Sequence, residues 1–530
     1  MNTRYLSFEE LKKIKREWLE NEQNRRFRAM MRHCYYNHEF IRNLLKERNL
    51  DYMDFSEIDD WQRKKLPLIR KIDYINKPQA FLINPKQEWN TSEDQIKHLK
   101  AFYDGMGCYK DESRFLFRNG LKYILSRKQN IAVYNRIKDH AARFYYPYTP
   151  LFSGGRTTGA PSACFLTRGD MKVLQNNSAN IGKLVWHPYA KKDIRLIAMN
   201  LFPALPHLGF WGVHLGFDEI ATVNLPTSPG LLPTEKLVTI AETFGANGLA
   251  GIPSFIRNRF LEVARDKKVK FASTGAVLLA GERIYKQTRE DIKNRFAELG
   301  MGECNVVGGY ASSETKHTFF GECQSDSGYH NLGPLSLTFR TVKINDPTGE
   351  DMTDYEFTSP EEGGLITIFH LDGTGTIFEC YLQGDYIEKV IDEPCSNCGV
   401  QTRSLYDISR SHESDFQLQV MGMLETKVKG ATVNLTHLRE VLLEIPGLRE
   451  VQIVIDKENQ DLNARDILIV RASKEKDALD KALHDKVRDV TKIEAEVTPN
   501  VEIIEHEDLL SEVEALKFAW IQDLRARYGK

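Results

Sequence analysis

The sequence has little cysteine for its size and no excess of charge of either sign. Its 530 residues include eight cysteines, which are too sparse to indicate a disulfide framework. Lys and Arg number 72 against 74 Asp and Glu, which gives a formal net charge of −2. Nucleic-acid binding depends strongly on a cationic surface, and the balanced charge of this chain gives no overall excess of cations. We therefore expect no nucleic-acid partner.

Long apolar runs are also missing. No stretch approaches the roughly 20 consecutive apolar residues that a membrane-spanning helix needs. Residues 1–5 lead into a charged helical stretch and do not resemble a secretory signal. We expect a cytoplasmic protein, a monomer or homodimer, with no membrane partner. The length allows several domains of roughly 150 residues each.

Apolar strands alternate with helical stretches from about residue 170 onward. The strands are expected at 194–201, 219–224 and 248–252, and the helices at 234–244, 254–267 and 283–299. This alternation predicts an α/β fold with a mostly parallel sheet, preceded by a helical N-terminal region. In such sheets functional residues gather at the carboxyl ends of the strands.

The pattern changes near residue 420. Two strands, at 447–455 and 466–471, and a charged amphipathic helix at 475–491 indicate a separate α+β unit of about a hundred residues. We therefore predict a large N-terminal domain over 1–420 and a small C-terminal domain over 421–530.

One glycine-rich stretch, Leu151–Pro161, stands out between two apolar segments. Its candidate ligand-binding residues are Ser153, Gly154, Gly155, Thr157, Thr158 and Gly159. Successive backbone N–H groups in such a turn form an anion-binding nest, and the hydroxyls add donors. A polyphosphate cradle and a plain glycine-rich hairpin turn fit the composition equally well. The Gly-Lys-Ser/Thr of the common P-loop does not follow.

Ser153–Pro161 resembles the phosphate loop of adenylate-forming enzymes, normally Ser-Gly-Thr-Thr-Gly-Lys-Pro. Arg156 interrupts that pattern and Ala160 replaces its lysine. Leu279-Ala-Gly-Glu-Arg283 and Gly308-Gly-Tyr-Ala-Ser-Ser-Glu314 then resemble two later motifs of these enzymes, in the same order. The N-terminal helix pair and Leu66-Pro-Leu resemble phenylacetate–CoA ligases. The chain thus resembles a phenylacetate–CoA ligase-like member of the adenylate-forming superfamily, and residues 88–143 resemble an insertion.

This resemblance implies a nucleotide site. Gly281, Glu282 and Tyr310 would lie against adenine, Ser313 would meet the α-phosphate, and Glu314 would hold Mg²⁺. Asp385, in Gly384-Asp385, would bind the ribose hydroxyls. Arg403 and Arg410 are candidates to contact phosphate or ribose from the following segment.

The resemblance also implies an acyl pocket and a mobile lid. The loop after strand 194–201 would line the acid site with His207, Phe210, Trp211 and Gly212. In the small domain, Lys429 and Gly430 resemble the family's Arg-Gly beside the thiol tunnel. A direct alignment puts Glu514 at the position of the family's adenylation lysine. Lys517 matches that position only if the alignment is shifted.

The activity implied is ATP- and Mg²⁺-dependent activation of an aryl or alkyl carboxylic acid through an acyl-adenylate. Coenzyme A is the family's default acceptor. An amine or a carrier protein as acceptor fits the degenerate motifs nearly as well. A non-catalytic nucleotide- or acyl-binding relative, and a zinc-bearing interaction protein, are the remaining alternatives.

Cysteine and histidine form one cluster along the chain. Cys395-Ser-Asn-Cys398 has the spacing of a zinc knuckle, and Cys323 and His330 lie upstream. Together they could provide a tetrahedral Cys₃His site. A redox pair is the rival interpretation, but no thioredoxin-like context surrounds it. Some relatives in the resembled family carry a structural zinc in this pattern, so we expect zinc.

Overall fold

The computed structural model describes most of the chain in detail. The described residues are 4–83, 93–156, 161–204, 207–281, 284, 286–346, 351–410, 425–461, 464–474, 480–505, 509 and 521–525. Predicted site residues that fall outside these ranges are Thr157, Thr158, Gly159, Glu282 and Lys517. The predicted domain boundary at 420/421 also falls outside them.

Helices cover the N-terminal region, as the sequence pattern predicts. They are α1 (Phe8–Leu11), α2 (Arg16–Asn37), α3 (Glu39–Glu47), α4 (Asp60–Arg63) and α5 (Lys71–Ile75), with short 3₁₀ turns at Tyr52–Asp54 and Pro78–Phe81. Phe27, Met30, Met31 and Cys34 recur at helical spacing on α2 and are fully buried in the core. This helix therefore anchors the region to the central sheet.

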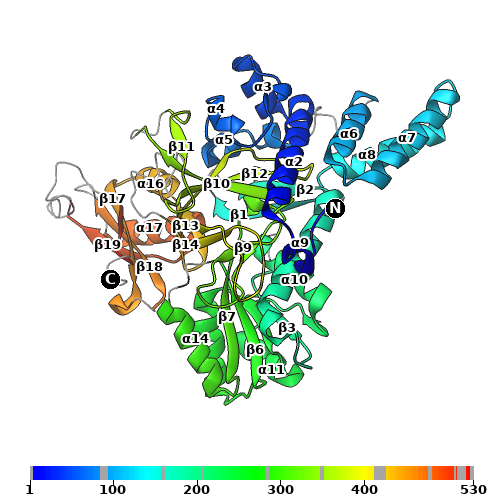
Figure 1. The fold of residues 1–530 in the computed structure, drawn as a ribbon. Helices are drawn as coiled ribbons and strands as arrows, with labels where there is room; N and C mark the ends of the chain where they lie inside the picture. Colours follow the sequence, from blue (N-terminus) through cyan, green and yellow to red (C-terminus); the bar gives the residue numbers. More distant parts are fainter. Residues whose placement is uncertain are drawn as a thin grey trace.

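Three further helices fill the segment predicted as an insertion. They are α6 (Glu93–Met106), α7 (Lys110–Leu125) and α8 (Ile131–Tyr145). Figure 1 shows them beside α2, with α7 and α8 projecting away from the sheets. Tyr109, between α6 and α7, donates a hydrogen bond to the carboxylate of Asp372, which also pairs with Arg4 at 2.8 Å. The insertion is thus tied to the large domain through a buried carboxylate.

A mixed sheet of twelve strands organises the described part of the large domain, in the order β11-β10-β12-β13-β14-β9-β8-β7-β6-β5-β3-β4. Its parallel half contains β3 (Ile197–Leu201), β4 (Val223–Leu225), β5 (Gly248–Gly251), β6 (Thr274–Leu279) and β7 (Glu303–Tyr310). Its antiparallel half contains β8 (Phe320–Gly321), β9 (Tyr329–Asn331), β10 (Leu337–Ile344), β11 (Tyr355–Phe357), β12 (Gly364–His370), β13 (Tyr381–Ile391) and β14 (Ser404–Arg410). Strand β7 is the junction, because it pairs parallel with β6 and antiparallel with β8.

Helices pack on the parallel half through apolar faces. They are α9 (Arg168–Trp186), α10 (Leu208–Ile220), α11 (Thr234–Phe244), α12 (Pro253–Phe255), α13 (Leu261–Asp266) and α14 (Lys286–Glu298), with a π-helical turn at Ile256–Phe260 and 3₁₀ turns at His187–Tyr189 and Ser313–Thr315 (η5). A separate antiparallel hairpin, β1 (Thr149–Arg156) and β2 (Pro161–Leu166), precedes α9. The predicted α/β fold class is confirmed.

The predicted loop at 203–214 and the predicted strand at 219–224 are both wrong in part. Helix α10 occupies Leu208–Ile220, and only Val223–Leu225 forms a strand. Three glycines make this segment look like a loop, but two of them serve helix packing. A Cβ on Gly212 would lie 2.4 Å from the Phe319 ring, and one on Gly216 would lie 2.6 Å from the Ser178 carbonyl oxygen. Tertiary packing therefore outweighs the low helix propensity of glycine.

The C-terminal region has its own sheet and core. The hairpin β15 (Glu425–Val428) and β16 (Ala431–Asn434) leads into α16 (Leu435–Leu443). A four-stranded sheet follows in the order β19-β18-β17-β20, with β17 (Leu448–Lys457), β18 (Asp466–Lys474), β19 (Asn500–Ile504) and β20 (Ile521–Asp523). A 3₁₀ turn at Glu458–Gln460 joins β17 to β18, and α17 (Asp480–Ala495) packs on the sheet. Among the described residues, no helix is both long and apolar enough to cross a membrane.

Candidate functional site

Tyr310 and Asp385, predicted from separate motifs, meet at the junction of the two half-sheets. Tyr310 ends β7 and its hydroxyl donates a hydrogen bond to Asp385 Oδ2 at 2.8 Å. Asp385 lies on β13, 75 residues further along the chain, and both side chains are half-buried. The carboxyl ends of β3, β5, β6 and β7 share this edge because these strands run parallel.

The turn after β7 is also fixed to β13, by a second side-chain hydrogen bond. Ser312 Oγ donates to Gln383 Oε1 at 2.8 Å, and Ser312 also caps η5, which contains Ser313 and Glu314. Glu314 is 6% exposed, and its backbone carbonyl accepts a hydrogen bond from His370 Nε2 at 2.9 Å. Burial lowers the pKa of His370 far below its usual value, so the ring is neutral. The turn that carries Glu314 is thus tied to β13, and the buried Glu314 carboxylate lies 3.5 Å from the Tyr381 hydroxyl.

The glycine-rich hairpin lies next to this turn. Strands β1 and β2 both contact η5, and Thr376 joins β2 to the large domain through bonds to Phe165. Ser153, Gly154 and Gly155 lie on β1, where a register irregularity between Phe152 and Arg156 interrupts the ladder. The structure therefore places residues 153–156 of the predicted phosphate loop on a strand, and residues 157–160 lie outside the described residues.

A buried ion pair that the sequence analysis did not predict connects the turn containing Glu314 to helix α9. Lys316 Nζ lies 3.1 Å from Asp170 Oδ2, and both side chains are fully buried. Burial alone would raise the pKa of Asp170, but the charges of Lys316 and His317 outweigh it and lower that pKa to about 2. Asp170 also accepts from the backbone N–H of Thr167 and Gly375. It therefore joins α9, the 372–376 loop and the Glu314 turn.

The C-terminal region contacts the large domain at Gly281 and at β1. Lys427 Nζ on β15 donates to the Gly281 carbonyl oxygen at 2.6 Å, and β16 packs along β1. Gly281 has a φ of +91°, which glycine adopts without strain. Lys429 and Gly430 form the turn between β15 and β16, with φ values of +52° and +84°. Lys429 Nζ lies 3.5 Å from the Thr498 carbonyl oxygen, and burial lowers its pKa.

Of the predicted acyl-pocket residues, His207 lies closest to the phosphate-loop hairpin. Its Nδ1 is 2.7 Å from the Phe152 carbonyl oxygen on β1. Phe210, Trp211 and Gly212 lie on the first turns of α10, where Phe210 stacks on His214 and Trp211 is 38% exposed. Gly212 permits the close approach of Phe319.

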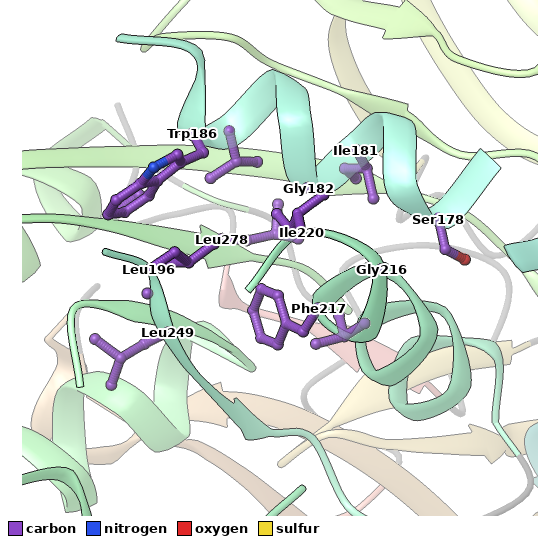
Figure 2. A pocket seen from close by; sticks show the side chains of 14 residues that line it. Ser178, Ile181, Gly182, Trp186, Leu196, Gly216, Phe217, Ile220, Leu249 and Leu278 are labelled. Carbon is purple, nitrogen blue, oxygen red and sulfur yellow. The ribbon is translucent and has the colours of Figure 1, made fainter. Parts of the chain in front are cut away.

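A small apolar cavity lies further along α10. It measures about 20 Å³ and lies between α9, α10 and the sheet. Figure 2 shows Ile181 and Gly182 of α9 and Phe217 and Ile220 of α10 around it. None of the four predicted acyl-pocket residues lines it. A space of this size holds about one water molecule, so it is a packing void and not an acid-binding pocket.

Arg403 is not brought to the Tyr310–Asp385 pair. Its Nε lies 2.9 Å from Asp392 Oδ1, and the guanidinium also faces Glu20 of α2. The β13–β14 register explains this position, because Asp385 pairs with Arg410 whereas the other end of β14, Ser404, pairs with Ile391. Arg410, at the same register level as Asp385, is the better placed of the two candidates by backbone.

The four predicted zinc ligands come together. Cys323, His330, Cys395 and Cys398 offer ligand atoms that all lie within 4.8 Å of one another. Cys323 Sγ and Cys395 Sγ are 3.7 Å apart, close to the ~3.8 Å edge that tetrahedral Zn–S bonds of about 2.3 Å produce. Ser404 Oγ lies 2.5 Å from His330 Nδ1, which leaves Nε2 facing Cys398 Sγ at 3.6 Å. The donor set and its burial fit a closed tetrahedral site.

Sequence comparison identifies no relative. No family model matches the chain, and no curated protein matches its sequence.

Solved structures do match its fold. A 2-hydroxyisobutyryl-CoA ligase in complex with 2-HIB-AMP and CoA in the thioesterification state superposes with a TM-score of 0.69. The match has 16% identity and covers 99% of this chain and 94% of that chain. The same ligase in an open conformation gives a TM-score of 0.52 at 14% identity, covering 94% and 90% of the two chains. Its postadenylation complex with 2-HIB-AMP gives 0.50 at 16% identity, covering 96% and 90%.

These scores concern the fold. The chain shares the fold of the 2-hydroxyisobutyryl-CoA ligase over nearly its whole length. Coverage changes little among the three structures of that ligase, whereas the TM-score drops outside the thioesterification state. In this chain β16 of the C-terminal region packs against β1. The finer resemblance to phenylacetate–CoA ligases stays a prediction.

Proposed function

We propose that the protein activates a carboxylic acid with ATP, forming an acyl-adenylate and pyrophosphate. The single observation behind this proposal is the meeting of Tyr310, Asp385 and the Glu314 turn beside the glycine-rich hairpin, within a fold shared with a CoA ligase. Three motifs that are weak one by one converge on one edge of the sheet. A fold alone does not define a function, but a matching site on it does support one.

Each residue has a chemical role in this proposal. Asp385 accepts hydrogen bonds from the ribose hydroxyls, and Tyr310 and Gly281 flank the adenine ring. The Glu314 carboxylate is a hard oxygen ligand suited to Mg²⁺, which would offset phosphate charge when bound. Ser153–Gly159 would cradle the phosphates with backbone N–H groups and hydroxyls. The acid oxygen then attacks the α-phosphorus, and the bond to pyrophosphate breaks.

We further propose that coenzyme A receives the acyl group. Support comes from the domain arrangement, which resembles the CoA-bound thioesterification state of the 2-hydroxyisobutyryl-CoA ligase. Lys429 and Gly430 would then lie beside the thiol path, with residues 421–530 acting as a lid. His207, Phe210, Trp211 and Gly212 would border the acid. Lys517 would stabilise negative charge during adenylation, after rotation of the lid.

Acid-dependent exchange of labelled pyrophosphate into ATP tests the proposal. A panel of aryl and alkyl acids should contain at least one that stimulates exchange. With that acid, continued release of AMP over many turnovers should require coenzyme A. If an amine or a carrier protein supports turnover and coenzyme A does not, the proposal of acid activation stands and the proposed acceptor is wrong. If no acid stimulates exchange, activation itself is contradicted.

We also propose that Cys323, His330, Cys395 and Cys398 hold one structural zinc ion. The site is closed by four protein ligands, so the metal would supply stability and no open coordination position. It would join the β8–β9 segment to the Cys395–Cys398 turn, whose neighbour Gln401 donates its N–H to the Leu11 carbonyl of α1. Purified protein should contain about one equivalent of zinc. A Cys398→Ser variant with unchanged metal content would exclude this ligand set.

A further inference from the structure

Helix α7 and the first residue of α8 expose an unusual amount of apolar surface. Phe117, Leu121, Ile124, Leu125 and Ile131 are 59%, 46%, 62%, 73% and 60% exposed. These five lie within 15 consecutive residues. The other nine large apolar side chains that are exposed, among the described residues, are spread over the rest of the chain. A soluble surface normally scatters such side chains singly, so the concentration on α7 needs a separate explanation.

The exposed apolar side chains of α7 form a stripe that the neighbouring helix α8 does not cover. Phe117, Leu121 and Ile124 recur at intervals of four and three residues, which places them on one helix face, and Leu125 adjoins them. The opposite face makes the internal contacts of the insertion: Leu116 is 3% exposed, and Tyr123 stacks on Tyr134 of α8 at 5.0 Å. The exposed stripe is therefore not part of the α6–α8 core.

A cationic stripe runs beside the apolar one. Arg114, Arg118 and Lys122 follow one another at four-residue intervals along α7, and all three are exposed. Between Ser113 and Lys138 the sequence contains seven basic residues and no acidic one, in a chain whose net charge is −2. The seven are Arg114, Arg118, Lys122, Arg127, Lys128, Arg136 and Lys138. The chain is neutral overall because this excess is balanced elsewhere.

We propose that α7 docks on an anionic phospholipid surface, lying flat at the headgroup level. An amphipathic helix with basic residues beside an apolar stripe binds such an interface by inserting the stripe and placing its cations near phosphate. Figure 1 shows α7 and α8 projecting away from the sheets, so a bilayer could reach them. The absence of a membrane-spanning helix among the described residues concerns insertion across a bilayer and not this mode of binding.

Charge and shape distinguish this occupant from two others. A second copy of the chain would bring two cationic stripes together, and like charges across an interface are unfavourable. An acidic protein would satisfy the charge, but it would need a groove complementary to a convex helix. A fluid bilayer accommodates one convex apolar face without such a groove. The observations therefore favour lipid.

Vesicle flotation of the purified full chain tests this proposal. The protein should bind vesicles containing phosphatidylglycerol about tenfold more tightly than vesicles of phosphatidylcholine alone, and salt should weaken the binding. The variant Leu121→Ser/Ile124→Ser/Leu125→Ser should lose at least about tenfold in affinity, because it removes the inserted stripe. Arg118→Gln/Lys122→Gln should lose the preference for anionic vesicles.

Matched variants control for surface changes elsewhere. Leu231→Ser/Phe244→Ser removes equally exposed apolar side chains, and Lys236→Gln/Lys267→Gln removes two exposed cations. Both should bind like the wild type. Failure to float with either vesicle, or binding unaffected by the α7 variants, would overturn the proposal. Retention on immobilised acidic polypeptide without flotation would assign the surface to a protein instead. A concentration-dependent dimer that the Leu121→Ser/Ile124→Ser/Leu125→Ser variant abolishes would assign it to a second copy.

Discussion

His33 shows how a single buried side chain sets the response of this fold to acid. It lies on α2, is 2% exposed, and stacks between Phe102 and Tyr145. Burial disfavours the charged imidazolium and lowers the pKa of His33 to about 3. The unfolded chain, with an ordinary histidine pKa of about 6.5, then binds a proton that the fold does not. The stability that His33 contributes is therefore complete above pH 6.5 and decreases as the pH falls.

The His33→Phe variant should lose part of this acid sensitivity. Between about pH 6.5 and pH 4, the wild type should lose about 1.4 kcal/mol of unfolding free energy per pH unit more than the variant. Denaturant unfolding at several pH values measures the difference. Equal slopes for wild type and His33→Phe would contradict a neutral, buried His33.

Single residues were predictable where a local motif names them, and not where a partner is distant. Tyr310 and Asp385 each belong to a short motif, and their contact follows once β7 and β13 share an edge. Arg403 was predicted at the nucleotide and lies instead against Asp392 and Glu20. The sequence shows that an arginine follows the motif, but only the β13–β14 register decides which end of the strand it occupies.

At the scale of elements, the Lys316–Asp170 pair connects the Glu314 turn to the start of α9. Asp170→Asn should destabilise the protein by about 3–5 kcal/mol, because it leaves the Lys316 ammonium buried without its counter-charge. Asp170→Asn/Lys316→Met should recover much of that loss, since it removes both charges together. Denaturant unfolding measures both effects.

An exposed pair gives the matched comparison. Asp94 and Lys97 on α6 are 3.4 Å apart, with side chains 79% and 75% exposed. Asp94→Asn should change stability by less than about 1 kcal/mol. If Asp170→Asn were equally mild, the pair would not support the turn as the structure indicates.

Elements with regular apolar spacing were predicted well, and those shaped by close packing were not. Helix α11 has the predicted bounds, because its buried positions follow the helical period. Helix α10 was predicted as a loop, because Gly209, Gly212 and Gly216 lower its helix propensity. Gly212 and Gly216 are required by Phe319 and Ser178, neighbours distant in the chain that the local sequence cannot reveal.

At the scale of the whole molecule, the arrangement of the two domains predicts separable effects on two half-reactions. Gly430 has a φ of +84° at the tip of the β15–β16 hairpin. Gly430→Val should slow acyl transfer by about tenfold or more, through backbone strain and obstruction of the thiol path. It should leave acid-dependent pyrophosphate exchange nearly unchanged. Rapid-quench measurement of each step separates the two.

Lys517→Ala is the complementary variant, because the proposed mechanism assigns this lysine to adenylation after rotation of the small domain. It should slow adenylate formation and leave transfer from a supplied acyl-adenylate intact. Parallel losses in both steps for both variants would contradict a lid that alternates between two positions.

The overall architecture was predictable because several motifs occur in the same order as in the family that the chain resembles. The βαβ alternation indicated the parallel sheet, and the change near residue 420 indicated a second domain. The way the two regions meet was not predictable, since the Lys427–Gly281 contact joins exposed residues 146 positions apart in the chain. The α7 stripe was also missed, because an apolar helix face reads as core until the structure shows it exposed.

Detection of the acyl-adenylate itself tests the central claim most directly. The protein is incubated with Mg·ATP and an acid that stimulates exchange, without acceptor, and the quenched mixture is analysed by mass spectrometry. We expect an adduct with the mass of acid plus AMP less water, present with wild type and absent with Glu314→Gln. ATP cleavage that does not depend on the acid, or an adduct formed equally by Glu314→Gln, would contradict it.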